Sequence, residues 1–155
     1  MPLGYIICGF AGVGKSSFYE GYGKHQYKYG GKDILDLDSS EFSSLTSFPI
    51  NYIDEVESKL PSYDYILISS HDSVIKELNE RKIYHFVIYP KRELKQKYMK
   101  NYIKRGSSLR FLNKMDRMWD KYITDCENAG PYSIKVVLDE DEYLYNVFIN
   151  PNYKL

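Results

Sequence analysis

The chain has 155 residues, and its 21 Lys and Arg balance 21 Asp and Glu, so the formal net charge at pH 7 is zero. A balanced charge gives no overall field that would attract nucleic acid or an anionic membrane. No apolar run approaches the roughly 18 residues of a membrane span, and the first residues lack the basic part of a secretion signal. Cys8 and Cys126 indicate free thiols in a reducing compartment. We therefore expect a cytoplasmic protein without a membrane partner, folded as a single domain over residues 1–155.

Apolar segments alternate with helical patterns along the chain. Short apolar segments predict strands at residues 3–7, 32–38, 63–70, 83–89 and 132–138. Helical spacing predicts helices that start at residue 15 and that cover 40–45, 49–60, 72–82 and 91–128, the last with a break at Gly106. Gly130, followed by Pro131, is expected to end the last helix as a C-terminal glycine. This order predicts an α/β domain with a five-stranded, mostly parallel sheet, and it leaves the acidic residues 139–142 and the remainder of the chain unassigned.

A glycine-rich turn comes after the first apolar segment. Gly9, Gly14, Lys15 and Ser16 match the pattern G-x-x-x-x-G-K-[ST] between a strand and a helix. The backbone N–H groups of such a loop can turn inward around phosphate oxygens, and the next helix points its positive end at the same anion. Lys15 would neutralise the β and γ oxygens, and the Ser16 hydroxyl would hold Mg²⁺. The residues expected to bind the nucleotide are Gly9, Gly12, Val13, Gly14, Lys15, Ser16 and Ser17.

Two acids close the second predicted strand. Asp36 and Asp38 are two residues apart and therefore point to the same side of it. The carboxyl ends of neighbouring parallel strands converge on one crevice, which is also where the glycine loop lies. A carboxylate there can accept a proton from an attacking hydroxyl or hold the Mg²⁺ shell. The alternative is that the pair is an ordinary polar turn.

Residues 91–110 are rich in Lys and Arg. The cations of interest lie directly after the fourth strand and on either side of a glycine: Lys91, Arg92, Arg105 and Arg110. Phosphoryl transfer needs cations over the β and γ phosphates, and Gly106 is a suitable hinge for a closing lid. Arginine suits this role better than lysine because its planar fork binds phosphate bidentately. Alternatives are a solvated helix face, or a grip on a nucleic-acid backbone with Tyr98 and Tyr102 between the cations.

A glycine loop of this kind occurs in both GTPases and kinases. Residues 113–116 read N-K-M-D and match the guanine-reading motif of GTPases, but they lie within a run of helical periodicity rather than after a strand. The third strand leads into Ser69 to Asp72, without the D-x-x-G of GTPases. These facts favour a kinase. His71 stands at the crevice edge as a candidate polar contact, with Asp72 beside it as a substitute carboxylate, whereas His85 within an apolar strand is expected to be a satisfied core histidine.

The glycine loop, the D-x-D after the second strand and the basic segment after the fourth together resemble the P-loop kinases of the nucleoside-monophosphate-kinase and shikimate-kinase type. More loosely, they resemble small kinase-like proteins encoded by bacteriophages. The resemblance implies a three-layer P-loop NTPase fold with a helical lid at 91–110, and ATP with Mg²⁺ as the donor. It implies that Asp38 contacts the acceptor and that Asp36, with Ser16, serves the metal. The catalytic set would be Lys15, Asp36, Asp38, Arg105 and Arg110. The third strand departs from the pattern, since it lacks the usual metal-side Asp and the glycine pair of shikimate kinases.

The sequence thus predicts ATP- and Mg²⁺-dependent phosphoryl transfer to a nucleotide-like small molecule, in the host cytoplasm if a phage encodes the chain. Residues 38–61 are expected to line the acceptor. The alternatives are a kinase for a polynucleotide or a modified DNA base, and a nucleotide-binding module without catalysis.

Overall fold

The computed structural model describes residues 4–20 and 33–148. Within these residues, five strands form one sheet in the order β2-β3-β1-β4-β5, and every neighbouring pair is parallel. The strands are β1 (Tyr5–Gly9), β2 (Ile34–Asp36), β3 (Tyr65–Ser69), β4 (His85–Pro90) and β5 (Ser133–Leu138). The predicted α/β class and five-stranded sheet are confirmed. Because β1 lies between β3 and β4, the chain changes direction across the sheet beside β1, where α/β proteins place their ligands.

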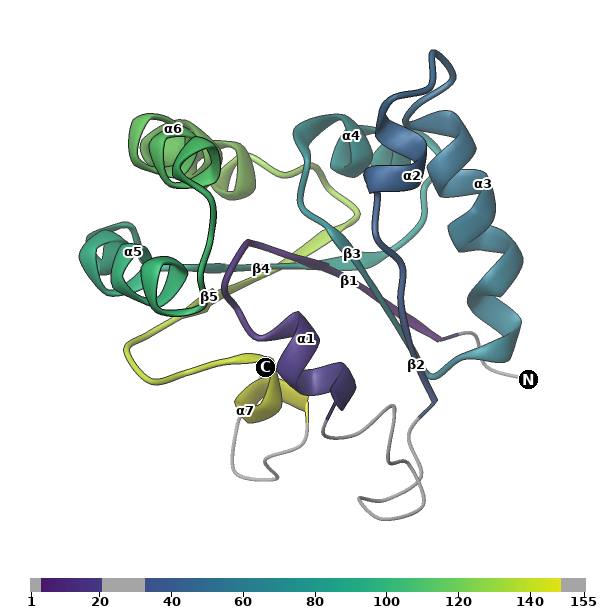
Figure 1. Ribbon diagram of the computed structural model, residues 1–155. Coiled ribbons are helices and arrows are strands. Elements are labelled where there is room, and N and C mark those ends of the chain that lie inside the picture. Colours follow the sequence, from purple (N-terminus) through teal and green to yellow (C-terminus); the bar gives the residue numbers. More distant parts are fainter. Residues whose placement is uncertain (1–3, 21–32, 149–155) are drawn as a thin grey trace.

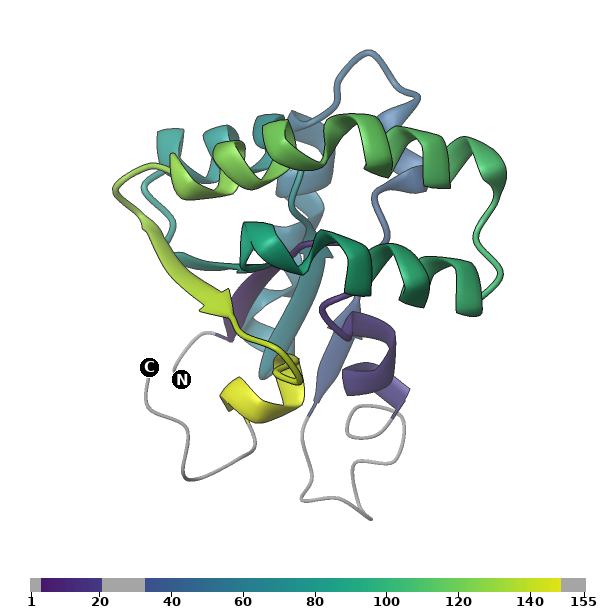
Figure 2. The same ribbon diagram turned by 90° about the vertical axis from the view of Figure 1, so that its left-hand side faces the viewer.

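Helices cover both faces of the sheet. The helices are α1 (Lys15–Phe18), α2 (Ser40–Ser43), α3 (Ile50–Lys59), α4 (Asp72–Glu80), α5 (Lys95–Lys104), α6 (Leu109–Glu127) and α7 (Leu144–Phe148), with short 3₁₀ turns η2 (Leu60–Ser62) and η3 (Arg92–Leu94). Figures 1 and 2 show α4 and α6 on one side of the sheet and α1 and α7 on the other. Residues 21 and 22 of the helix predicted from residue 15 lie outside the described residues. No helix among the described residues is both long and apolar enough to cross a bilayer.

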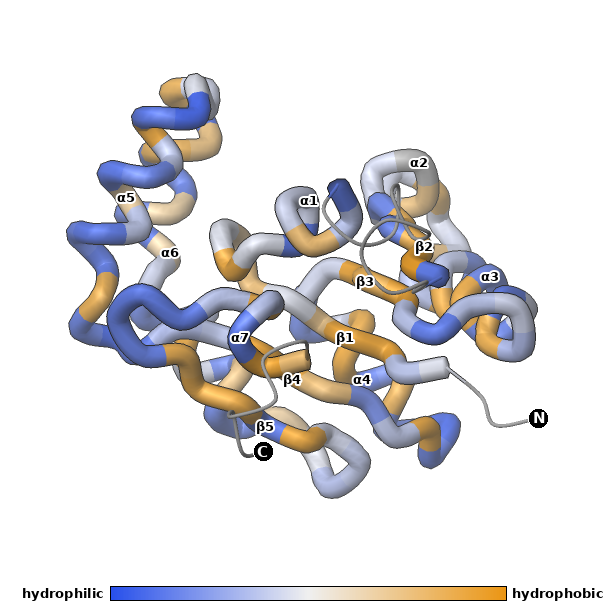
Figure 3. Tube along the Cα trace, turned by 90° about the horizontal axis from the view of Figure 1, so that it is seen from below, coloured by the Kyte–Doolittle hydropathy of each residue, from blue (hydrophilic) through white to orange (hydrophobic). Residues whose placement is uncertain are grey.

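The hydrophobic stretches of the chain follow the central strands (Figure 3). Strands β3 and β4 are buried along almost their whole length, as expected for a parallel sheet covered on both faces. Helix α6 starts where the Ser108 hydroxyl accepts a hydrogen bond from the Phe111 N–H, and it buries Met115, Trp119 and Ile123 at helical spacing. The sequence signals for these elements and the contacts they make therefore agree.

The end of α6 differs from the prediction. Its cap is Asn128, with φ −96°, and Gly130 does not adopt the left-handed conformation expected of a C-terminal glycine. Gly130 is constrained in another way: a Cβ there would lie 2.7 Å from the side chain of Asn79, which would have to shift. Asn79 in turn accepts a hydrogen bond from the Tyr132 N–H at 2.8 Å, so this contact ties α4 to the start of β5.

Candidate functional site

The glycine loop joins β1 to α1 at the carboxyl edge of the sheet. Gly12 and Gly14 have φ of +92° and +99°, values that only glycine adopts without strain. A Cβ on Gly9 would lie 2.9 Å from Cδ of Lys15, because the lysine side chain folds back over the end of β1 and donates to the Gly9 carbonyl. The loop is also held from the far end of the chain, where the Leu144 N–H donates to a loop carbonyl at 3.0 Å.

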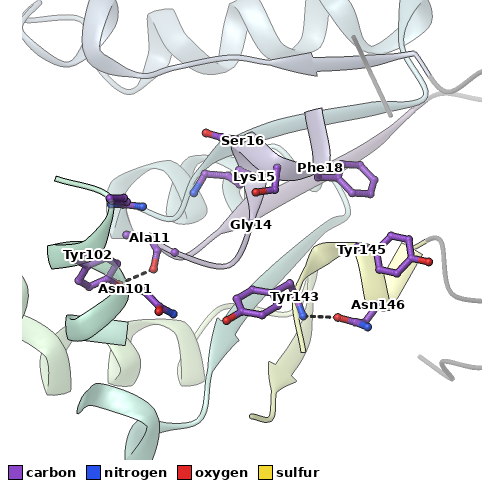
Figure 4. A pocket seen from close by; sticks show the side chains of 13 residues that line it. Ala11, Gly14, Lys15, Ser16, Phe18, Asn101, Tyr102, Tyr143, Tyr145 and Asn146 are labelled. Atoms are coloured by element: carbon purple, nitrogen blue, oxygen red, sulfur yellow. Dashed lines mark hydrogen bonds between the residues drawn. The ribbon is translucent and has the colours of Figure 1, made fainter. Parts of the chain in front are cut away.

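Among the described residues, two pockets meet at this loop. The first has a volume of about 880 Å³ and lies between the loop, α5 and the segment that leads into α7 (Figure 4). Its wall includes Gly12, Gly14, Lys15, Ser16, Ser17, Asn101, Tyr102, Arg105, Tyr143, Tyr145 and Asn146. The second, of about 640 Å³, includes Gly9, Lys15, Asp38, Ser69, Ser70, His71, Asp72, Phe111, Lys114 and Tyr122. Lys15 belongs to both.

The charge of Lys15 is poorly solvated. Burial lowers the pKa of its ammonium from 10.5 to about 8, although the nearby Asp36 carboxylate acts in the opposite direction. Burial likewise raises the pKa of Asp36, and Lys15 partly opposes that rise. A bound anion next to Lys15 would compensate the charge of the ammonium.

The two predicted acids occupy different positions. Asp38 lines the second pocket, and its Oδ1 accepts a hydrogen bond from the Ser40 N–H at 2.9 Å. Asp36 ends β2 and interacts electrostatically with Lys15, but it lines neither of the two pockets described above. The structure therefore places Asp38 at one pocket and Asp36 near the lysine that both pockets share.

The end of β3 and the residues that follow it contribute to the second pocket. His71 lines it, and burial lowers the pKa of its imidazole, with the positive charges of Lys114 and Lys15 adding to the effect. Asp72 lines the same pocket but is paired with Lys76 at 2.9 Å. His85, by contrast, is 1% exposed, and its Nδ1 lies 2.8 Å from the Ile83 carbonyl. The prediction of a satisfied core histidine is confirmed.

The four cations singled out in the basic segment take three different positions. Lys91 pairs with Asp139 at 2.8 Å, and Arg92 pairs with Asp120 and Glu127 at 3.0 and 2.7 Å, so both hold surface elements together. Arg105 lines the first pocket. Exposed Arg110 lines neither of the two pockets described above.

The tyrosines Tyr98 and Tyr102 of this segment are buried. Tyr98 and Tyr102 are 2% and 0% exposed, and both rings pack against Gly12 of the loop. Helix α5 thus uses both rings to pack against the glycine loop, and the alternative that the basic segment grips a nucleic-acid backbone stays a hypothesis that cannot rely on exposed tyrosine rings. The corner at Gly106, with φ +84°, is open around its Cα, and a lid that closes there stays a prediction.

The sequence did not identify two walls of the pockets. Tyr143, Tyr145 and Asn146 come from the segment left unassigned, and Phe111 and Lys114 come from α6. Residues 38–61 were expected to line the acceptor pocket. Among the described residues, Asp38 alone from this stretch lines the second pocket. The N-K-M-D residues lie inside α6, as their helical periodicity indicated. The periodicity of a helix predicts the face on which residues such as Phe111 and Lys114 lie, but it does not predict which pocket that face lines.

The described residues hold no group of three or more His, Cys, Asp or Glu that could bind a metal ion. Mg²⁺ does not need such a group when substrate phosphates supply most of its oxygens. The Ser16 hydroxyl on the first pocket and the Asp36 carboxylate near Lys15 suit this partial role.

No protein-family model and no curated protein sequence matches the chain. The fold and the site thus define an α/β protein with a glycine loop and two adjoining pockets at the carboxyl edge of a parallel sheet.

Proposed function

We propose that the protein transfers the γ-phosphoryl group of ATP, with Mg²⁺, to a nucleotide-like small molecule. The observation that carries this proposal is the position of Lys15, which lines both pockets. Transfer between two substrates needs them side by side with a cation at the group that moves. Both volumes, about 880 and 640 Å³, fall in the range of small-molecule sites.

The first pocket takes the donor in this proposal. Gly12 and Gly14 have φ of +92° and +99°, a left-handed backbone that lets the N–H groups of such a loop turn toward phosphate oxygens. Lys15 holds the β and γ oxygens, and Arg105 supplies a second cation from α5. Ser16 and Asp36 would hold Mg²⁺, which would supply positive charge against the β and γ phosphates. Tyr143, on the opposite wall in Figure 4, offers a ring beside the nucleoside end.

The second pocket takes the acceptor. Asp38 accepts the proton of the acceptor hydroxyl, whose oxygen forms a bond to the γ phosphorus. The bond between that phosphorus and the β–γ bridging oxygen breaks, and ADP leaves with the bond's electron pair. Lys114 lies over the ring of Phe111, with its Nζ 5.7 Å from the ring centroid, and is suited to an anionic group on the acceptor. The Phe111 ring, the Lys114 ammonium and the Asp38 carboxylate in one pocket together support a nucleotide-like acceptor.

Calorimetry and a transfer screen test the proposal. Wild-type protein should bind Mg–ATP more tightly than Mg–GTP and should phosphorylate at least one member of a panel of nucleosides, deoxynucleosides and their monophosphates. Lys15→Ala should abolish both binding and transfer while circular dichroism shows the fold intact. Lys91→Ala is the matched control, because Lys91 is paired with Asp139 away from both pockets. Wild-type activity in Lys15→Ala would refute the proposal.

A second candidate is a nucleotide-binding module without catalysis. It is favoured by the end of β3, where Ser69 and Ser70 line the second pocket instead of a carboxylate that would serve the metal. Tight Mg–ATP binding with no transfer to the small molecules or to oligonucleotides would establish this candidate in place of the kinase. A preference for GTP would instead support the GTPase hypothesis, which is based on the N-K-M-D residues 113–116.

A further inference from the structure

One tyrosine hydroxyl joins the glycine loop to α5. Tyr102, which is 0% exposed, donates through its hydroxyl to the Ala11 carbonyl at 2.6 Å. In a trans peptide the C=O and N–H groups point in opposite directions, so this bond turns the Gly12 N–H away from the tyrosine hydroxyl. No residue in the described part of the chain accepts a hydrogen bond from that N–H. The bond therefore leaves one loop N–H oriented and free to donate to an anion.

The ring of Tyr102 also fills the space behind the loop. A Cβ on Gly12 would lie 2.9 Å from Cε1 of Tyr102 and 3.1 Å from Cδ2 of Tyr98. Gly12 itself has φ +92°. The two rings therefore leave no room for a side chain at Gly12, and the loop backbone lies close to the Tyr102 ring at this residue.

The guanidinium of Arg105, which lines the first pocket, stacks on the same ring. The guanidinium carbon of Arg105 lies 4.9 Å from the ring centroid of Tyr102 and 5.2 Å from that of Phe111. Arg105 Nε also donates to the Ser107 hydroxyl at 3.0 Å. Stacking on aromatic faces holds a guanidinium in one plane and restricts its rotamers. Tyr102 therefore contacts both groups that would face a phosphate, the loop peptide and Arg105.

We infer that Tyr102 is a positioning residue for phosphate binding: it sets the Ala11–Gly12 peptide through its hydroxyl and Arg105 through its ring. This inference rests on the proposed function, since it requires phosphate in the first pocket. The hydroxyl and the ring of Tyr102 can be distinguished, because a phenylalanine at this position would keep the ring beneath Arg105 and lose only the bond to Ala11.

The test measures Tyr102→Phe with two probes, Mg–ATP and Mg–tripolyphosphate. The chain's single tryptophan, Trp119, lies 5.2 Å in ring-centroid distance from Phe10 of the loop, so its fluorescence can report binding. One hydrogen bond contributes on the order of a 5- to 10-fold change in an equilibrium constant. We expect Tyr102→Phe to weaken the binding of both probes by this same factor, because the affected Gly12 N–H would contact phosphate and not the nucleoside.

Tyr52→Phe is the matched control. Tyr52 is also 0% exposed and donates through its hydroxyl to a backbone carbonyl outside the loop, that of Leu37. Because Leu37 lies between Asp36 and Asp38, both variants are also measured with tripolyphosphate in the absence of Mg²⁺. Both variants should lower the melting temperature to a similar extent, but only Tyr102→Phe should lose affinity. If Tyr102→Phe loses stability and binds both probes like the wild type, Tyr102 is merely structural and the inference is wrong, while the proposed function stands. If the wild type binds neither probe, the proposed function fails as well.

Discussion

Replacing Lys15 with methionine should stabilise the ligand-free protein and abolish its affinity for phosphate. The reason is that Lys15 holds an ammonium in a largely enclosed position, where burial lowers its pKa from 10.5 to about 8. Methionine has a similar length and no charge to desolvate. Residues selected for binding often cost stability in this way.

The expected size of the gain can be worked out from the pKa shift. Each unit corresponds to about 1.4 kcal/mol, so the full penalty of the buried charge at pH 7 is about 3 kcal/mol. The side chain keeps some contact with solvent, which screens part of this penalty. Methionine also loses the hydrogen bond that Lys15 donates to the Gly9 carbonyl. We therefore expect Lys15→Met to raise the free energy of unfolding at pH 7 by about 1 kcal/mol.

The pH dependence gives the sharper test. Below pH 8 both the folded and the unfolded wild-type chains carry the Lys15 proton, and the penalty is fully present. Between pH 8 and 10.5 the unfolded chain holds this proton and the folded chain does not, so wild-type stability rises through that window relative to the variant. Urea titrations followed by Trp119 fluorescence at pH 7 and pH 10 should show the gap between the two proteins shrinking. A variant less stable than the wild type at pH 7, or a gap unchanged at pH 10, would show that the buried ammonium does not destabilise the fold.

Three further predictions concern the site and the fold. Affinity for Mg–tripolyphosphate should fall about tenfold between pH 7 and pH 9, because Lys15 loses its proton near pH 8, and a flat profile would contradict this. Asp38→Asn should slow phosphoryl transfer by about 10²-fold or more and leave Mg–ATP affinity near that of the wild type; an unchanged rate would move the search for the base to Asp72. Gly130→Ala should cost roughly 1–3 kcal/mol in urea titrations, since its Cβ would lie 2.7 Å from the Asn79 side chain, with Mg–ATP affinity unaffected. A Gly130→Ala variant as stable as the wild type would show that Asn79 can move aside.

The order and type of the elements up to β5 could be predicted from the sequence, because the signals for these are local, whereas α7 lies in the stretch that the sequence left unassigned. Near-continuous apolar residues predicted β3 and β4, and the spacing of Met115, Trp119 and Ile123 predicted the long helix α6. The glycines of the loop were recognisable because a left-handed backbone restricts which residue can stand there. Asp38 at the strand end could be placed at the crevice since parallel strands share one carboxyl edge.

The contacts between these residues depend on packing that the sequence does not reveal. Tyr102 and Ala11 are 91 residues apart in the chain, and no periodicity indicates that one donates to the other. The predicted role of Gly130 was wrong for the same reason: its constraint is the distant Asn79 side chain and not the end of its own helix. The depressed pKa of Lys15 likewise depends on the groups packed around it. A local pattern indicates which way a side chain points along its own element, but pocket walls and burial are set by packing between elements that are far apart in sequence.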